Sequence, residues 1–100
     1  NDCIVNSTVF DEIKAAIRKE SFSTTRVEIA KSLIQKYECF TTMQIKDLLP
    51  LFSLETDKLE IAKYSYAYCK DKENYDTVKN FFTSGESRDQ ISNYIKNYTE

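Results

Sequence analysis

This sequence offers few candidate sites for acid, base or metal chemistry. There is no histidine, which removes the commonest general base, the usual base partner of a catalytic serine or cysteine, and histidine-containing zinc sites. The chain has a single glycine, so it holds no glycine-rich phosphate-binding loop. We therefore expect no catalytic residues, no metal, no cofactor, and a protein that is not an enzyme.

Two acidic stretches come nearest to a chemical site. Residues 71–76 place four oxygen-bearing side chains close together: Asp71, Glu73, Asn74 and Asp76. The glycine turn and the closing bidentate glutamate of a calcium loop are missing, so helix capping is the better interpretation. Residues 55–60 hold three more acidic side chains, whose helical spacing favours ordinary contacts with neighbours on the surface.

Tyrosines form the other group of residues with functional potential, because tyrosine is enriched at the binding hot spots of protein interfaces. Among the seven tyrosines, Tyr66 and Tyr68 have the spacing of core residues. Tyr64 falls toward the more polar flank of its helix beside Glu60, and Tyr98 ends the last apolar stripe; we take these two as the candidate partner surface. The alternative for these two is a core side chain whose hydroxyl reaches water.

The elements that position these residues are expected to be helices. The chain is 41% hydrophobic with one glycine and one proline, a composition that argues against disorder and against a loop-rich β fold. After an N-terminal arm over residues 1–6, apolar spacing and capping signals predict helices at about 8–19, 24–37, 42–51, 55–70, 72–82 and 87–98. Together they make a single domain of 100 residues.

Residues 59–69 read as the central helix, because apolar side chains occur on two opposite faces and both need a neighbour. Residues 24–31 also align without a gap on residues 56–63, which indicates related helical units. We expect an all-α fold of six short antiparallel helices in stacked pairs, forming a compact bundle or a short solenoid-like array. Predicted N-caps are Ser7 or Thr8, Thr41 with Gln44, and Ser87 with Gln90.

Cysteine placement suggests one disulfide bond. If the first two helices form an antiparallel hairpin, Cys3 precedes the first and Cys39 follows the second, so both lie at one end of the hairpin. The rival pairing joins Cys39 to Cys69. Because Cys69 shares an apolar stripe with Leu59, it reads better as a small buried hydrophobic residue.

Several classes of partner are disfavoured. The net charge is −2 and the basic residues are scattered, which argues against nucleic acid. No apolar run approaches the ~20 residues that span a bilayer, so we expect no membrane insertion. Asn6 and Asn97 begin Asn-x-Ser/Thr sequons and are candidate glycosylation sites, although a chain rich in these residues forms such triplets by chance.

The order of several short patterns resembles a small helical family catalogued as domain of unknown function 4476. The resemblance covers Cys3 to Ile95 and rests on these residues: Thr41, Gln44, Ile45, Phe52, Ser53, Leu54, Glu55, Lys58, Leu59, Glu60, Ala62, Lys63, Tyr66, Asp71, Asn74, Tyr75, Val78, Ser87, Ile91, Tyr94 and Ile95. Residues 83–86 depart from the pattern. Members often follow a signal peptide, so the resemblance implies an extracytoplasmic setting, and it implies no activity.

Two classes of function remain. The first is a non-catalytic protein-interaction or scaffold module of a secreted or periplasmic protein, whose partner is an unknown protein. The alternative is a small-ligand-binding domain or enzyme with a pocket between helices. A deep pocket with convergent polar groups would favour the alternative.

Overall fold

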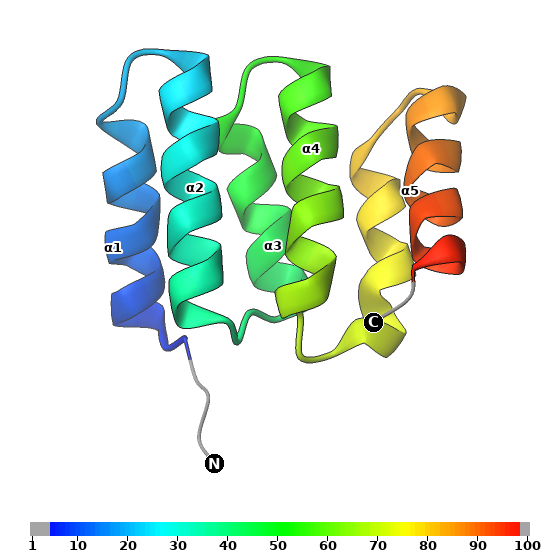
Figure 1. Ribbon diagram of the computed structural model, residues 1–100, viewed down its shortest axis with the longest axis horizontal. Coiled ribbons are helices and arrows are strands. Elements are labelled where there is room, and N and C mark those ends of the chain that lie inside the picture. The colour runs from blue at the N-terminus through cyan, green and yellow to red at the C-terminus, as the bar shows by residue number, and fades with distance from the viewer. Residues whose placement is uncertain (1–4, 99–100) are drawn as a thin grey trace.

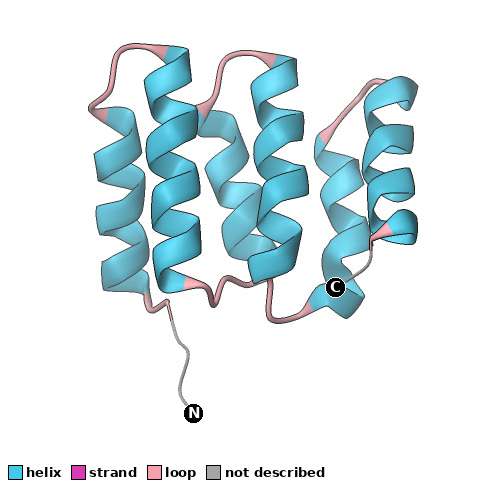
Figure 2. Ribbon diagram, viewed as in Figure 1, coloured by secondary structure: helices cyan, strands magenta, loops and turns pink. Residues whose placement is uncertain are grey.

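The structure, a computed structural model, describes residues 5–98 and is built from helices. Its α-helices are α1 (Ser7–Arg18), α2 (Ser23–Tyr37), α3 (Thr42–Leu48), α4 (Glu55–Ser65) and α5 (Gly85–Asn97). Its 3₁₀ helices are η1 (Leu49–Leu51), η2 (Tyr66–Tyr68) and η3 (Lys72–Phe81). Figure 2 shows no strand in this part of the chain, where an isolated parallel bridge joins Phe40 to Cys69. The predicted all-α class is confirmed.

The helices follow one another as three helical hairpins: α1 with α2, α3 with α4, and η3 with α5. Figure 1 shows the chain running alternately up and down along these elements. In this arrangement α4 packs against α2 and α3 and also against α5. Ile61 and Ala62 of α4 are fully buried, as expected for a helix that has apolar side chains on two faces.

The first helix of each hairpin carries the same buried pattern. The N-cap residues are Asn6, Thr41 and Asp71. Buried side chains follow each cap at the fourth, seventh and eleventh positions: Phe10, Ile13 and Ile17; Ile45, Leu48 and Phe52; Tyr75, Val78 and Phe82. Three helices with one register therefore build the shared core, since each set alone is too small to exclude water.

The second helix of each hairpin also repeats. The N-cap residues of α2, α4 and α5 are Phe22, Leu54 and Ser84. Four residues after each cap stands a basic side chain. In α2 the Arg26 Nε donates to the Glu20 carbonyl oxygen at 2.7 Å, and in α5 the Arg88 Nε donates to the Phe82 carbonyl oxygen at 2.8 Å. The first and third hairpins therefore share the same contact, in which an arginine donates to the carbonyl oxygen six residues before it.

Three predicted helices differ in form from the sequence-based expectation. The helix expected over 42–51 is an α-helix only to Leu48 and continues as η1, which contains Pro50. The helix expected over 55–70 is divided, because α4 ends at Ser65 and the chain continues as η2. The segment expected as a helix over 72–82 is the 3₁₀ helix η3. Tyr75, Val78 and Phe81 recur at every third residue, and a helix with three residues per turn places them on one side.

The helix starts differ at two places and agree at a third. Asn6, rather than Ser7 or Thr8, caps α1, and its Oδ1 accepts from the Val9 N–H at 2.9 Å. α5 begins two residues before Ser87 because the Ser84 side chain is its cap. The predicted capping box of Thr41 and Gln44 is confirmed at α3.

Candidate functional site

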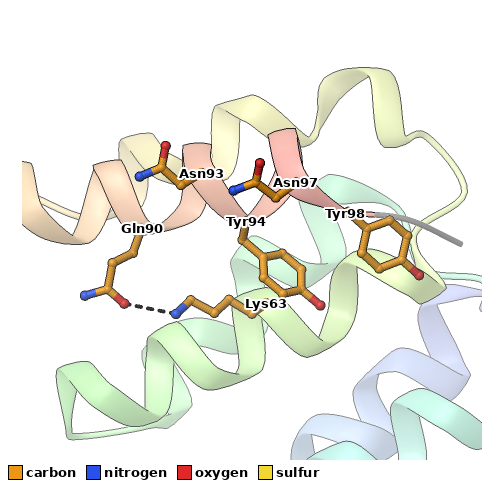
Figure 3. Close-up of a pocket in the computed structure, with 6 residues that line it drawn as sticks. All are labelled: Lys63, Gln90, Asn93, Tyr94, Asn97 and Tyr98. Carbon is orange, nitrogen blue, oxygen red and sulfur yellow. Dashed lines mark hydrogen bonds between the residues drawn. The ribbon is translucent and has the colours of Figure 1, made fainter.

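A groove of about 650 Å³ lies between α4 and α5 and is open to solvent (Figure 3). We call it the α4–α5 groove. α4 contributes Lys63, and the rest of the lining comes from α5 and its C-cap: Gln90, Asn93, Tyr94, Asn97 and Tyr98. The lining thus combines one ammonium group, three amides and two phenols, without an acidic residue.

Lys63 is the charged group of this lining. Its Nζ donates to the Gln90 Oε1 at 2.9 Å, the contact drawn in Figure 3. An ammonium group has three donors, so this bond to a neutral amide leaves donors available. No carboxylate within residues 5–98 forms an ion pair with Lys63. The side chain is half-buried against the neighbouring helix.

A related groove of about 310 Å³ lies between α2 and α4, and we call it the α2–α4 groove. It is lined by Thr24, Val27, Glu28, Lys31, Asp57 and Glu60. Lys31 of α2 forms an ion pair with Glu60 of α4. The α2–α4 groove therefore already contains the carboxylate that balances its lysine.

The two lysine contacts occupy equivalent positions in successive hairpins. Lys31 and Lys63 both stand nine residues after the N-cap of their helix. Glu60 and Gln90 both stand six residues after theirs. A glutamate in α4 is thus replaced by a glutamine in α5, and the ion pair becomes a charge-to-amide hydrogen bond.

Aromatic rings hold one end of the α4–α5 groove. Tyr66, just after α4, packs edge-on against Tyr98 with ring centroids 4.9 Å apart and against Tyr94 at 6.4 Å. Tyr66 also meets the buried Tyr75 at 5.0 Å, and the Tyr75 hydroxyl donates to the Ala62 carbonyl oxygen at 2.6 Å. Burial, and secondarily the neighbouring Tyr98, raise the pKa of the Tyr94 hydroxyl, which stays protonated and able to donate.

The structure separates the two tyrosines predicted to form a partner surface. Tyr98 lines the α4–α5 groove, whereas Tyr64 does not. The Tyr64 ring lies 5.5 Å from the ring of Tyr68, and the Lys31 Nζ sits 5.3 Å from its centroid. Burial raises the pKa of Tyr64, and Tyr68 adds to that effect.

Sequence reasoning missed four lining residues: Lys63, Gln90, Asn93 and Tyr94. The signal that would have found the key contact was the repeat itself. Residues 24–31 align on 56–63, and the same repeat continues in α5, where Gln90 takes the position of Glu60.

The sequons have different surroundings. Asn6 caps α1 through its side-chain oxygen and is exposed. Asn97 is also exposed but lines the α4–α5 groove. A glycan attached at Asn97 would fill this groove, so glycosylation there and binding of a partner in the groove exclude each other.

The predicted disulfide involves Cys3, which lies outside the described residues, so the bond to Cys39 stays a prediction. Cys69 is a free and buried cysteine, so the rival bond to Cys39 is not formed. The Cys69 Sγ donates to the Asp71 Oδ1 at 3.2 Å, and burial is the main cause that raises the pKa of its thiol.

Asp71 joins two hairpins through hydrogen bonds. Its Oδ1 accepts from the Thr42 N–H at 2.7 Å and the Thr42 hydroxyl at 3.0 Å, and its Oδ2 accepts from Asn74. Burial alone would raise the pKa of Asp71, but these hydrogen bonds and the one from Cys69 outweigh it and lower the pKa to about 2. Between residues 5 and 98, no cluster of three potential histidine, cysteine or carboxylate ligands is found.

Residues 4–95 match the family described as domain of unknown function (DUF4476). The chain belongs to this family. The match confirms the resemblance found in the sequence, and it spans all three hairpins of this DUF4476 domain up to Ile95 in α5. Comparisons with curated proteins and with solved structures give no match. Of the helices described, none has the length and apolar character required to cross a membrane.

Proposed function

We propose that this DUF4476 domain is a non-catalytic protein-interaction module and that its partner binds in the α4–α5 groove. The observation that carries the proposal is a set of exposed polar groups with no role in the fold. Asn93 and Asn97 are exposed, and no described residue forms a hydrogen bond with either side chain. Amides that do not stabilise their own chain are available to a partner.

The shape and chemistry of the groove support binding without catalysis. It is open along the surface, whereas enzyme sites and small-molecule sites are usually concave and bury most of the ligand. Its lining supplies amides, phenols and one ammonium group, but no nucleophile paired with a base. Such groups orient and hold a partner.

A small-ligand-binding domain or enzyme is the second candidate. The groove volume of about 650 Å³ is sufficient for a small molecule, and its six lining side chains include several polar ones. The two candidates differ in what the groove retains: a protein in the first case and a small metabolite in the second.

Affinity capture from an extract of the source organism tests the proposal. The bait is the whole chain, compared with an Asn93→Ala/Asn97→Ala variant and with Gln35→Ala, which removes an exposed amide of α2 outside both grooves. We expect proteins that are retained by the wild type and by Gln35→Ala but lost from the double variant. Retention that is equal on all three baits, or no protein retained, contradicts the proposal. Mass spectrometry of small molecules released from the same baits tests the second candidate.

We also infer an extracytoplasmic location, supported by the family resemblance and by the sequence positions of Cys3 and Cys39, one before the first helix and the other after the second. Persistent structural disulfides belong to oxidising compartments. Non-reducing peptide mapping of protein from its natural source should yield a Cys3 peptide linked to a Cys39 peptide. Three alkylatable thiols would contradict both the bond and the location.

A further inference from the structure

We infer that the α4–α5 groove binds an acidic peptide segment of a partner protein. Lys63 holds a carboxylate of this segment, and the amides of α5 pair with its backbone. The inference rests on the proposed interaction role and specifies the chemistry of the partner.

The charge argument comes from the repeat. In the α2–α4 groove, the lysine of one hairpin is balanced by Glu60 of the next. In the α4–α5 groove, the equivalent position holds Gln90, and the lining contains no carboxylate. Glu60, which lies one turn before Lys63 on α4, is engaged by Lys31. The position that a carboxylate fills in the first groove is therefore open to a partner in the second.

The amides indicate that the carboxylate arrives on a peptide. Gln90, Asn93 and Asn97 follow one another at spacings of three and four residues, which places them in a row along one side of α5. Asn93 and Asn97 are separated by a rise of about 6 Å along the helix. Alternate residues of an extended peptide are about 6.6 Å apart, and each exposes an N–H and a C=O on the same edge.

An amide side chain matches this pattern because it donates and accepts at once. Asn93 and Asn97 can therefore each pair with one peptide unit of an extended segment while Lys63 holds an acidic side chain at the Gln90 end. In Figure 3, Lys63 reaches from α4 to Gln90 at the lower edge of α5, while Asn93 and Asn97 project upward from the same helix. The Tyr94 ring projects downward beside Lys63 and gives the segment an apolar surface.

Nuclear magnetic resonance titration of the whole chain tests the inference. The probes are a capped octapeptide of alternating glutamate and serine, the same peptide with glutamine for glutamate, and an oligogalacturonate with the same number of carboxylates. We expect the acidic peptide to shift the side-chain amide signals of Gln90, Asn93 and Asn97. The glutamine peptide should bind about tenfold more weakly, because it lacks charge-assisted hydrogen bonds.

Three variants assign the effect to the groove. Lys63→Gln and Gln90→Glu should each weaken binding of the acidic peptide about tenfold, the first by removing the charge and the second by balancing it internally. Gln90→Glu places in α5 the residue that α4 carries at Glu60, so the helix tolerates it. Lys36→Gln, which removes an exposed lysine of α2 outside both grooves, should leave the affinity unchanged.

Equal affinity for the acidic and glutamine peptides, unchanged binding by Gln90→Glu, or no binding of the acidic peptide at millimolar concentration would overturn the inference. A preference for the oligogalacturonate over the peptide would overturn it in favour of an anionic polysaccharide. In each case, groove-dependent capture of a protein from the extract still supports the broader interaction role, so the two failures can be told apart.

Discussion

The α2–α4 groove and the α4–α5 groove are formed by equivalent positions of successive hairpins and differ in charge. The first contains Glu28, Asp57 and Glu60 with one lysine, whereas the second contains one lysine with amides and phenols. The exchange of Glu60 for Gln90 at one repeated position changes an internally balanced contact into one with an unbalanced cation. The repeated scaffold thus sets the positions of the side chains, and a single substitution decides which junction pairs its lysine with a carboxylate and which with an amide.

The two junctions also differ in what covers them. α4 has helices on both sides, and its central residues are fully buried. α5 packs on η3 and α4, while its residues Asn93 and Asn97 remain exposed. The second helix of the last hairpin is therefore more exposed to solvent than that of the hairpin before it.

The largest expected effect comes from the helix that both grooves share. Leu59→Ala in α4 should lower the free energy of unfolding by about 2–5 kcal/mol, because it leaves a cavity at a side chain that is 7% exposed. Urea denaturation followed by circular dichroism measures the loss. Met43→Ala, at a side chain that is 64% exposed, is the control and should change stability by about 0.5 kcal/mol or less. Similar losses in both variants would refute the central position of α4.

Arg26 in the first hairpin and Arg88 in the third, which both donate to backbone carbonyl oxygens, should differ in how much they stabilise the fold. Arg26 donates to the carbonyl oxygens of Glu20, Arg18 and, across the hairpin boundary, Leu51, while Arg88 donates to Phe82. We expect Arg26→Ala to cost about 2–4 kcal/mol and Arg88→Ala about 1–2 kcal/mol, since charged hydrogen bonds are stronger than neutral ones. Chemical denaturation of the two variants gives the ranking, and a larger loss for Arg88→Ala would reverse the interpretation.

Asp71 should make the junction between the second and third hairpins sensitive to acid. Its pKa is about 2 in the folded protein against 3.8 for an ordinary aspartate, so the unfolded chain takes up the proton first as pH falls. The stabilisation is complete well above pH 3.8 and is lost as pH falls through 2.

Asp71→Asn should cost about 1–2 kcal/mol at pH 7, because it removes a charged acceptor of several hydrogen bonds. The difference in unfolding free energy between the wild type and the variant should shrink between pH 4 and pH 2. A difference that stays constant over this range would show that the carboxylate contributes nothing through its charge.

The smallest expected effect is a difference in salt dependence between the two lysine contacts. A double-mutant cycle on Lys31 and Glu60 should give a coupling of about 0.2–1 kcal/mol that weakens in salt, because both side chains are partly exposed. The same cycle on Lys63 and Gln90 should show little salt dependence. Gln90→Glu should give the second contact the salt dependence of the first, and its absence would mean that the two positions are not equivalent in energy.

Most of the helical architecture was accessible from the sequence. Apolar spacing predicted the location of every main helix, and the capping box at Thr41 was recognised because its two partners are three residues apart. The helix ends were less accessible. Ser65 and Tyr66 have no sequence signal that divides α4 from η2, since the change follows from how Tyr66 packs against Tyr75 and Tyr98.

The candidate site was accessible only in part. Tyr64 and Tyr98 were both predicted to belong to a partner surface, but Tyr98 lines the α4–α5 groove, whereas Tyr64 lies beside Tyr68 and Lys31. Helical periodicity describes the faces of one helix and does not say which neighbour each face meets. Residues that meet across helices, such as Lys63 and Gln90, are invisible to it.

Composition and periodicity by themselves determined the all-helical class and the two-faced α4, because both depend on which side chains of a single helix avoid water. Only the tertiary structure decided that Lys31 meets a carboxylate and Lys63 an amide. Each of these contacts joins residues 27 or more positions apart on different helices, so its existence depends on how the helices pack together. Local sequence patterns do not predict contacts between residues this far apart in the sequence. Such contacts depend on the free energy of packing the whole chain.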